Sequence, residues 1–218
     1  LLQSFKNQGF RVYGVDPAVT VAEVAIKQGI QTHIGLFSDE IIKDFPEQYR
    51  QADLITAFNV FAHSDNMKGM IDGVRKLLKP EGVFCFEVQY LVPILDKFLL
   101  GTIFHEHRIH YSVTSANNFL KQNDLELIDL EQNNIQKGAI IFYVVKKGSP
   151  LKPKPIVNKM LEIEKNKGYL DGDRFNEFQL RIHNTSKSVA VLKEKYFNEA
   201  RYLLHLEPLG LVLHLLYN

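Results

Sequence analysis

The sequence predicts a doubly wound, Rossmann-like α/β fold, in which helices cover both faces of a mostly parallel sheet. From Arg11 to about Pro80, short β-rich runs alternate with helical patterns, as the crossover connections of a parallel sheet require. Two later runs, 125–132 and 139–148, have no helix between them and are expected to form a terminal antiparallel hairpin. Apolar residues make up 45% of the 218-residue chain and charged residues 23%, values typical of a folded globular protein.

The composition excludes several classes of function. The 26 basic and 25 acidic side chains give a net charge of +1, so no bulk field favours a nucleic acid or an anionic membrane. The single cysteine, Cys85, cannot form an intrachain disulfide or a cysteine-rich zinc site. No apolar run reaches the ~20 residues that span a bilayer. We therefore expect a cytoplasmic protein that binds neither nucleic acid nor membrane.

The elements of the first half follow from local signals. Gly29 closes the first helical stripe, Pro46 interrupts the second and Pro80 stops the third. The strands between them are nearly uninterrupted apolar runs, which suit strands covered on both faces. The expected strands are 11–17, 30–35, the first part of 52–63, and 82–90, and the expected helices are 19–29, 39–50 and 67–80.

The second half has a different order of elements. After the strand that ends near Val88 we expect a helix at 93–101, a polar segment at 102–112, a helix at 115–125 and then the antiparallel hairpin. A Pro-rich linker follows at 149–155, and helix-like residues extend from there to about residue 205. We therefore expect one domain at 1–149, and a linker with the helical start of a further region at 150–218.

The first residues are expected to form the end of a helix. Leu1, Leu2 and Phe5 lie one to four residues apart, and Gly9 is a suitable residue to follow a helix. Only its last two turns would be present, so we expect the chain to be truncated at its N-terminus.

A carboxylate stands at the end of the first expected strand. Asp16 and Pro17 follow it directly, and ligands of open α/β sheets bind at the carboxyl ends of the strands. Asp16 is therefore a candidate to accept hydrogen bonds from ribose hydroxyls. The alternative is that Asp16 starts a turn and caps the next helix.

Phe58 and Asn59 end the strand that begins at Ala52. An aromatic ring and an amide at that position are suited to hold an adenine or an amino-acid tail, and the alternative is a core phenylalanine with a helix-capping asparagine. Glu87 lies in an otherwise apolar strand and is expected to face a cleft. His63 lies in a nearby loop. These residues would meet Asp16 at one edge of the sheet.

The polar segment 104–111 contains three histidines, a carboxylate and a tyrosine. An extended chain would place His105 and His107 on one face, and a helix would place His107 beside His110. Neither geometry collects three ligands, so we expect no metal. Histidine titrates near neutral pH and a neighbouring carboxylate can orient its ring, which favours a general acid–base site. The alternative is a hydrogen-bonded polar loop.

The order of five segments resembles that of a known family. GVDPA, ADLITAFNVFAH, LLKPEGVFCFEVQYL, TIFHEHRIHYS and KGAIIFYVVKKG occur over roughly residues 1–150. Together they resemble the class I S-adenosylmethionine-dependent sugar C-methyltransferases. The resemblance implies the Rossmann-like methyltransferase sheet, S-adenosylmethionine as cofactor and a nucleotide-linked keto-deoxysugar as substrate. It also implies flanking zinc-binding and C-terminal domains in full-length members.

By this resemblance, Asp16 and Pro17 stand where the cofactor ribose is held, and Phe37 stands where the adenine is packed. Phe58 and Asn59 lie beside the cofactor. His107 matches the general base of the family, with Glu106 as its neighbour and His63 as a further catalytic histidine. The expected substrate side comprises Phe104, Tyr90, Tyr111 and Glu87.

Three features depart from the family pattern. Phe104 replaces a tyrosine, and Gln136-Lys137-Gly138-Ala139 stands where a histidine–glycine–glycine–serine run is usual. The first strand of the family, which is central in its sheet and carries a Gly-rich turn, has no counterpart in the sequence. This absence again implies that the chain is truncated.

The leading hypothesis is C-methylation, in which His107 removes a proton next to a ketone and His63 or Tyr111 stabilises the enolate oxygen. An O- or N-methyltransferase for another small molecule is the first alternative. A catalytically inactive fragment that acts as a binding module is the second. A nicotinamide-dependent Rossmann enzyme is the third, and the terminal hairpin argues against it.

Overall fold

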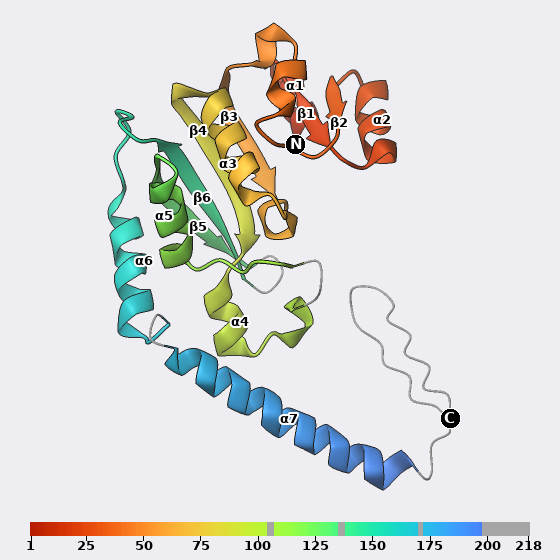
Figure 1. Ribbon diagram of the computed structural model, residues 1–218, viewed down its shortest axis with the longest axis vertical. Coiled ribbons are helices and arrows are strands. Elements are labelled where there is room, and N and C mark those ends of the chain that lie inside the picture. Colours follow the sequence, from red (N-terminus) through yellow and green to blue (C-terminus); the bar gives the residue numbers. More distant parts are fainter. Residues whose placement is uncertain (104–106, 135–137, 170–171, 198–218) are drawn as a thin grey trace. The chain divides into compact units, whose positions relative to one another are not determined.

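The computed structural model describes residues 1–103, 107–134, 138–169 and 172–197 (Figure 1). The chain divides into two compact units, Leu1–Leu170 and Asp171–Asn218. In the described residues, the first unit holds every strand and the second holds one long helix, α7 (Asp173–Phe197). The described strand ends, where ligands of open α/β sheets bind, therefore all belong to the first unit.

The strands of the first unit form two sheets. In the smaller one, β1 (Gly14–Asp16) pairs in parallel with β2 (Thr32–Ile34). The larger sheet has the order β3-β4-β6-β5. Its strands are β3 (Ala52–Phe58), β4 (Leu78–Gln89), β5 (Leu125–Asn133) and β6 (Ala139–Lys146). β3 and β4 run parallel, whereas β6 is antiparallel to both of its neighbours, which confirms the predicted fold class and its terminal hairpin.

Helices α1 (Leu2–Asn7), α2 (Val19–Lys27) and α3 (Met67–Leu77) belong to the first half. α2 ends before Gly29, whose φ of +79° lies in the left-handed region that glycine adopts without strain. α3 begins at Asn66, whose side chain accepts a hydrogen bond from the amide of Gly69. The end of α2 agrees with the role expected of Gly29, and α3 begins at Met67, as expected.

The stretch 39–50 corrects the expectation of a helix broken at Pro46. It forms two short 3-10 helices, η1 (Ile41–Asp44) and η2 (Glu47–Tyr49). The proline leaves each piece about one turn long, and such pieces are closed by the tighter i→i+3 hydrogen bonds. β4 also starts earlier than expected, at Leu78, because Ala52 of β3 pairs with that residue.

The short 3-10 helix η3 (Phe61–His63) lies between β3 and α3. The second half contributes α4 (Leu91–Lys97), the short 3-10 helix η4 (Leu100–Thr102), α5 (Val113–Gln122) and α6 (Pro155–Asn166). α5 and α6 pack against β5 and against each other (Figure 1). α6 lies beyond the expected boundary at residue 149, yet it belongs to the first unit because its apolar side chains join the common core.

Stacked phenylalanines hold the larger sheet together. The ring of Phe86 on β4 lies 5.1 Å from Phe84, 5.0 Å from Phe142 on β6 and 5.0 Å from Phe61, measured between ring centroids. All four side chains are buried. Cys85 and Glu87, which point to the opposite face of β4, are buried too, so the strand is covered on both faces from Phe84 to Gln89.

Of the strands that the structure describes, β1 and β3 are edge strands of their two sheets. Among the described strands, β1 pairs only with β2, and β3 pairs only with β4 on that side. Apolar side chains of β3 are partly open to solvent, with Leu54 exposed by 45% and Phe58 by 37%.

None of the helices in the described part of the chain is both long enough and apolar enough to cross a bilayer.

Candidate active site

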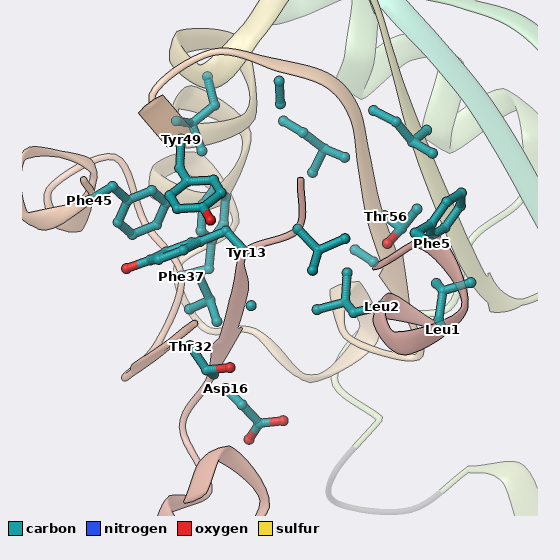
Figure 2. Close-up of a pocket in the computed structure, with 18 of the residues that line it drawn as sticks. Leu1, Leu2, Phe5, Tyr13, Asp16, Thr32, Phe37, Phe45, Tyr49 and Thr56 are labelled. Atoms are coloured by element: carbon teal, nitrogen blue, oxygen red, sulfur yellow. The ribbon is translucent and has the colours of Figure 1, made fainter. Parts of the chain in front are cut away.

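A cavity of about 800 Å³ lies between the unpaired edges of β1 and β3. Its walls are mainly apolar. Tyr13, Phe45 and Tyr49 group on one side, with Tyr13 at 4.8 Å from each of the other two ring centroids (Figure 2). Leu2 and Phe5 of α1 lie on the other side, beside Thr56 of β3 (Figure 2).

Asp16 lies at one end of this cavity, where β1 stops (Figure 2). Its Oδ1 accepts a hydrogen bond of 2.8 Å from the amide of Ala18, so the side chain does form the expected turn. Its Oδ2 has no hydrogen-bond partner in the described part of the chain. Asp16 can therefore hold the turn and still offer an acceptor to a ligand. Pro17 is exposed and follows the strand end without lining the cavity.

Two of the expected cofactor residues, Phe37 and Phe58, line the same cavity. Phe37 packs closely on Gly73 of α3, since a Cβ added there would lie only 2.9 Å from the Phe37 ring. Gly73 thus lets the ring lie against the helix. Asp16, Phe37 and Phe58 thus line one cavity, from the end of β1, the segment after β2 and the end of β3.

Asn59 and Glu87 meet at the carboxyl ends of β3 and β4. Asn59 has a φ of +55°, and its amide donates to the carbonyl of Glu87 over 3.1 Å. The Glu87 carboxylate is only 6% exposed and accepts hydrogen bonds from Asn133 (2.9 Å) and, more weakly, from Asn59 (3.5 Å). Asn133, at the end of β5, carried no signal in the sequence that would assign it to a site.

His107 lies beside His63 and His110. The ring centroid of His107 is 4.9 Å from that of His63 and 5.7 Å from that of His110. Its Nδ1 lies 2.9 Å from the carbonyl oxygen of Thr102, which can only accept. In the neutral ring this assigns the proton to Nδ1 and leaves the lone pair on Nε2. The arrangement can therefore accept a proton at Nε2.

A backbone hydrogen bond and an ion pair hold the segment around His107 against the segment around His63. The amide of Arg108 donates to the carbonyl of Ala62 over 3.0 Å, and the Arg108 guanidinium forms an ion pair of 2.6 Å with Asp65. These contacts join the residues next to His107 to the residues around His63. They link positions more than forty residues apart, and local sequence patterns do not reveal them.

His110 is placed to remain neutral. Burial lowers the pKa of its imidazole below the ordinary value of 6.5, and the neighbouring His107 lowers it further.

Burial raises the pKa of the Cys85 thiol to about 11, with the charges of Glu131 and Glu87 adding to the effect. Cys85 is thus not a thiolate at neutral pH. In the described residues no group of three or more histidine, cysteine or acidic side chains is arranged to hold a metal ion.

Tyr90 and Tyr111 are buried, and their hydroxyls contact the protein. Tyr90 donates to Glu164 over 2.9 Å, and Tyr111 lies 3.5 Å from the carbonyl oxygen of Phe61. Burial raises the pKa of both phenols, and the charge of Glu164 adds to the effect at Tyr90. Contact of either residue with a substrate stays a prediction. Phe104 and Glu106, which were assigned to the same region, lie outside the described residues.

Comparisons with known proteins agree with this fold. Residues 1–130 match the family described as a methyltransferase domain. The chain is 31% identical over 177 residues to the C-methyltransferase NovU of Streptomyces niveus, a match that covers 81% of this chain and 42% of NovU. It is also similar to a chain of the complex between the Haloferax volcanii Trm112 methyltransferase activator and a methyltransferase. That likeness has a TM-score of 0.54, with 13% identity over 66% of this chain and 76% of the other.

The chain therefore belongs to the methyltransferase domain family. Its fold is the Rossmann-like fold of S-adenosylmethionine-dependent methyltransferases. The match spans less than half the length of NovU, the curated relative.

Proposed function

We propose that this chain is part of an S-adenosylmethionine-dependent C-methyltransferase that acts on a nucleotide-linked keto-deoxysugar. The observation that carries the proposal is the environment of His107, whose Nδ1 lies 2.9 Å from a carbonyl oxygen and whose Nε2 is thereby left as the basic nitrogen. The likeness to NovU, a C-methyltransferase, supports methylation at carbon.

In this reaction the nucleophile is a carbon atom of the sugar, and the protein must supply the base that generates it. A C–H bond next to a ketone is acidic enough for His107 to remove the proton, which leaves an enolate on the sugar. His63, with its ring centroid 4.9 Å from that of His107, is near enough to act on the enolate oxygen as it becomes negative. S-adenosylmethionine, when bound, supplies a methyl group that bonds to this carbon as the sulfur–methyl bond breaks, leaving S-adenosylhomocysteine.

The residues at the strand ends suit the adenosine part of that cofactor. Asp16 offers Oδ2 as an acceptor for ribose hydroxyls, and Phe37 and Phe58 offer apolar surface in the same cavity. Asn59 and Glu87 add polar groups at the neighbouring strand end. These groups match the donors, acceptors and aromatic ring of an adenosine.

We also propose that the active enzyme has one more strand between β1 and β3. Both strands end their sheets with an unpaired edge, and unpaired backbone groups beside an apolar cavity are costly. A strand paired with both edges would join the two sheets into one. It would also cover the exposed side chain of Leu54 within β3, and leave Asp16 and Phe58 at the carboxyl ends of β1 and β3 open to the cofactor.

The test is incubation of the active enzyme with methyl-labelled S-adenosylmethionine and a panel of nucleotide-linked keto sugars. The same sugars with the ketone reduced to a hydroxyl are the matched controls. We expect label only in the keto sugars, with the product mass raised by one methylene unit. Equal labelling of the reduced sugars would instead indicate an O-methyltransferase, and no labelling of any sugar would favour a binding module.

A further inference from the structure

Glu164 is a fully buried carboxylate far in sequence from the strand ends. It lies on α6 with an exposed fraction of 0%. A charged group in such a place is expensive unless donors replace its lost water. The identity of those donors shows what the residue does.

Four donors surround the Glu164 carboxylate. Its Oε1 accepts from the Tyr90 hydroxyl (2.9 Å) and from the amide of Val113 (2.7 Å). Its Oε2 accepts from the amide of Thr114 (2.8 Å) and from the hydroxyl of the same residue (2.6 Å). Short bonds of this kind to a carboxylate are about twice as strong as neutral ones. Both oxygens are therefore fully engaged.

The four donors belong to two parts of the fold, the start of α5 and the residue that follows β4. Val113 and Thr114 are the first residues of α5, where the amides have no partner within the helix and the helix dipole favours a negative charge. Tyr90 directly follows β4 and forms an isolated β-bridge with Tyr111, whose carbonyl accepts from the amide of Leu91 over 2.9 Å. Glu164 thus joins the end of β4, the start of α5 and the helix α6.

The start of α5 closely follows residues 107–110, which carry His107 and His110 and are called the histidine segment. Only Tyr111 and Ser112 separate His110 from Val113. On its other side, the segment is held by the contacts of His107 with Thr102 and of Arg108 with Ala62. The position of the imidazole rings therefore depends on these contacts at one end and on the hydrogen bonds of Glu164 to the start of α5 at the other.

We propose that Glu164 is a positioning residue for methyl transfer, which acts by holding the segment that carries His107 and His110. This inference rests on the proposed function, because it takes His107 as the base. Glu164 lies beyond residue 130, where the match to the methyltransferase family ends. The helix α6 is accordingly part of the catalytic apparatus and more than a link to the second unit.

The test compares Glu164→Gln with Glu162→Gln in the active enzyme. Glu162 lies on the same helix but is exposed, so it controls for loss of one charge. In Glu164→Gln an amide NH₂ faces donors, and the start of α5 must shift. We expect kcat per folded enzyme to fall about 10- to 100-fold, since a misplacement near 1 Å can cost about 100-fold. The KM for the sugar and the Kd for S-adenosylmethionine should change less than about threefold.

Folded enzyme is counted in each sample by titrating its cofactor sites. If Glu164→Gln is too unstable to measure, Thr114→Val removes one donor and keeps the carboxylate, and we expect a smaller fall in kcat with the same unchanged KM. A loss of activity that only follows the loss of folded enzyme would overturn the inference, as would a kcat within twofold of the wild type. If the wild-type enzyme itself transfers no methyl group to a keto sugar, the proposed function fails first.

Discussion

Asp16 offers a substitution that separates its two possible roles. Its Oδ1 accepts from the amide of Ala18 and its Oδ2 does not bond to any described residue. In Asp16→Asn, the remaining oxygen can keep the turn while the acceptor for a ribose hydroxyl becomes a donor. In Asp16→Ala, both roles are lost, and loss of the turn hydrogen bond alone costs about 0.5–1.5 kcal/mol of stability.

Hydrogen bonds to a charged group contribute about 1.5–3 kcal/mol. We therefore expect Asp16→Asn to weaken the binding of S-adenosylmethionine about 10- to 150-fold, with little change in the melting temperature. Titration calorimetry on the active enzyme measures the affinity. Glu23→Gln on the exposed face of α2 is the control for a lost charge. An affinity within threefold of the wild type would show that Asp16 is only a turn residue.

Two further predictions concern folding and pH. The 218-residue chain expressed alone should self-associate or bind S-adenosylmethionine poorly, because β1 and β3 leave unpaired edges around an apolar cavity, and a monomer with micromolar affinity would contradict this. The pKa of the His110 imidazole is lower in the folded protein than in the unfolded chain, so the unfolded chain takes up a proton at His110 more readily. The folded state should therefore lose stability as pH falls below about 6.5. In His110→Gln this loss should be smaller, and parallel denaturation midpoints from pH 7.5 to about 5.5 for both proteins would refute the assignment.

Local signals were sufficient for most of the fold. Gly29 marks a helix end that depends only on neighbouring residues, and the apolar runs of β4 and β6 identify the sheet. The early start of β4 was not predictable in this way, since it follows from the pairing of Leu78 with Ala52. Tertiary pairing overrides helical propensity there.

In the candidate site, too, some residues could be predicted from the sequence and others depend on tertiary contacts. Asp16, Asn59 and Glu87 could be chosen from the sequence because the carboxyl ends of parallel strands meet at one edge. The contact of Asn133 with Glu87 depends on the hairpin register, which no local pattern fixes. Glu164 did carry a signal, because it falls on the buried stripe of α6 with Val157 and Met160. A charge on an apolar stripe indicates a buried partner, but the partner itself comes only from the structure.

Proton exchange at the sugar tests the central claim most directly. The active enzyme, a nucleotide-linked keto sugar and an unreactive analogue of the cofactor are mixed in deuterated water, and the proton next to the ketone is followed by NMR. The wild type and the control His183→Asn, at an exposed position of α7, should exchange this proton. In His107→Asn the exchange should slow by about 10²–10⁴-fold, the usual contribution of a general base. Exchange in His107→Asn at the wild-type rate would contradict the account.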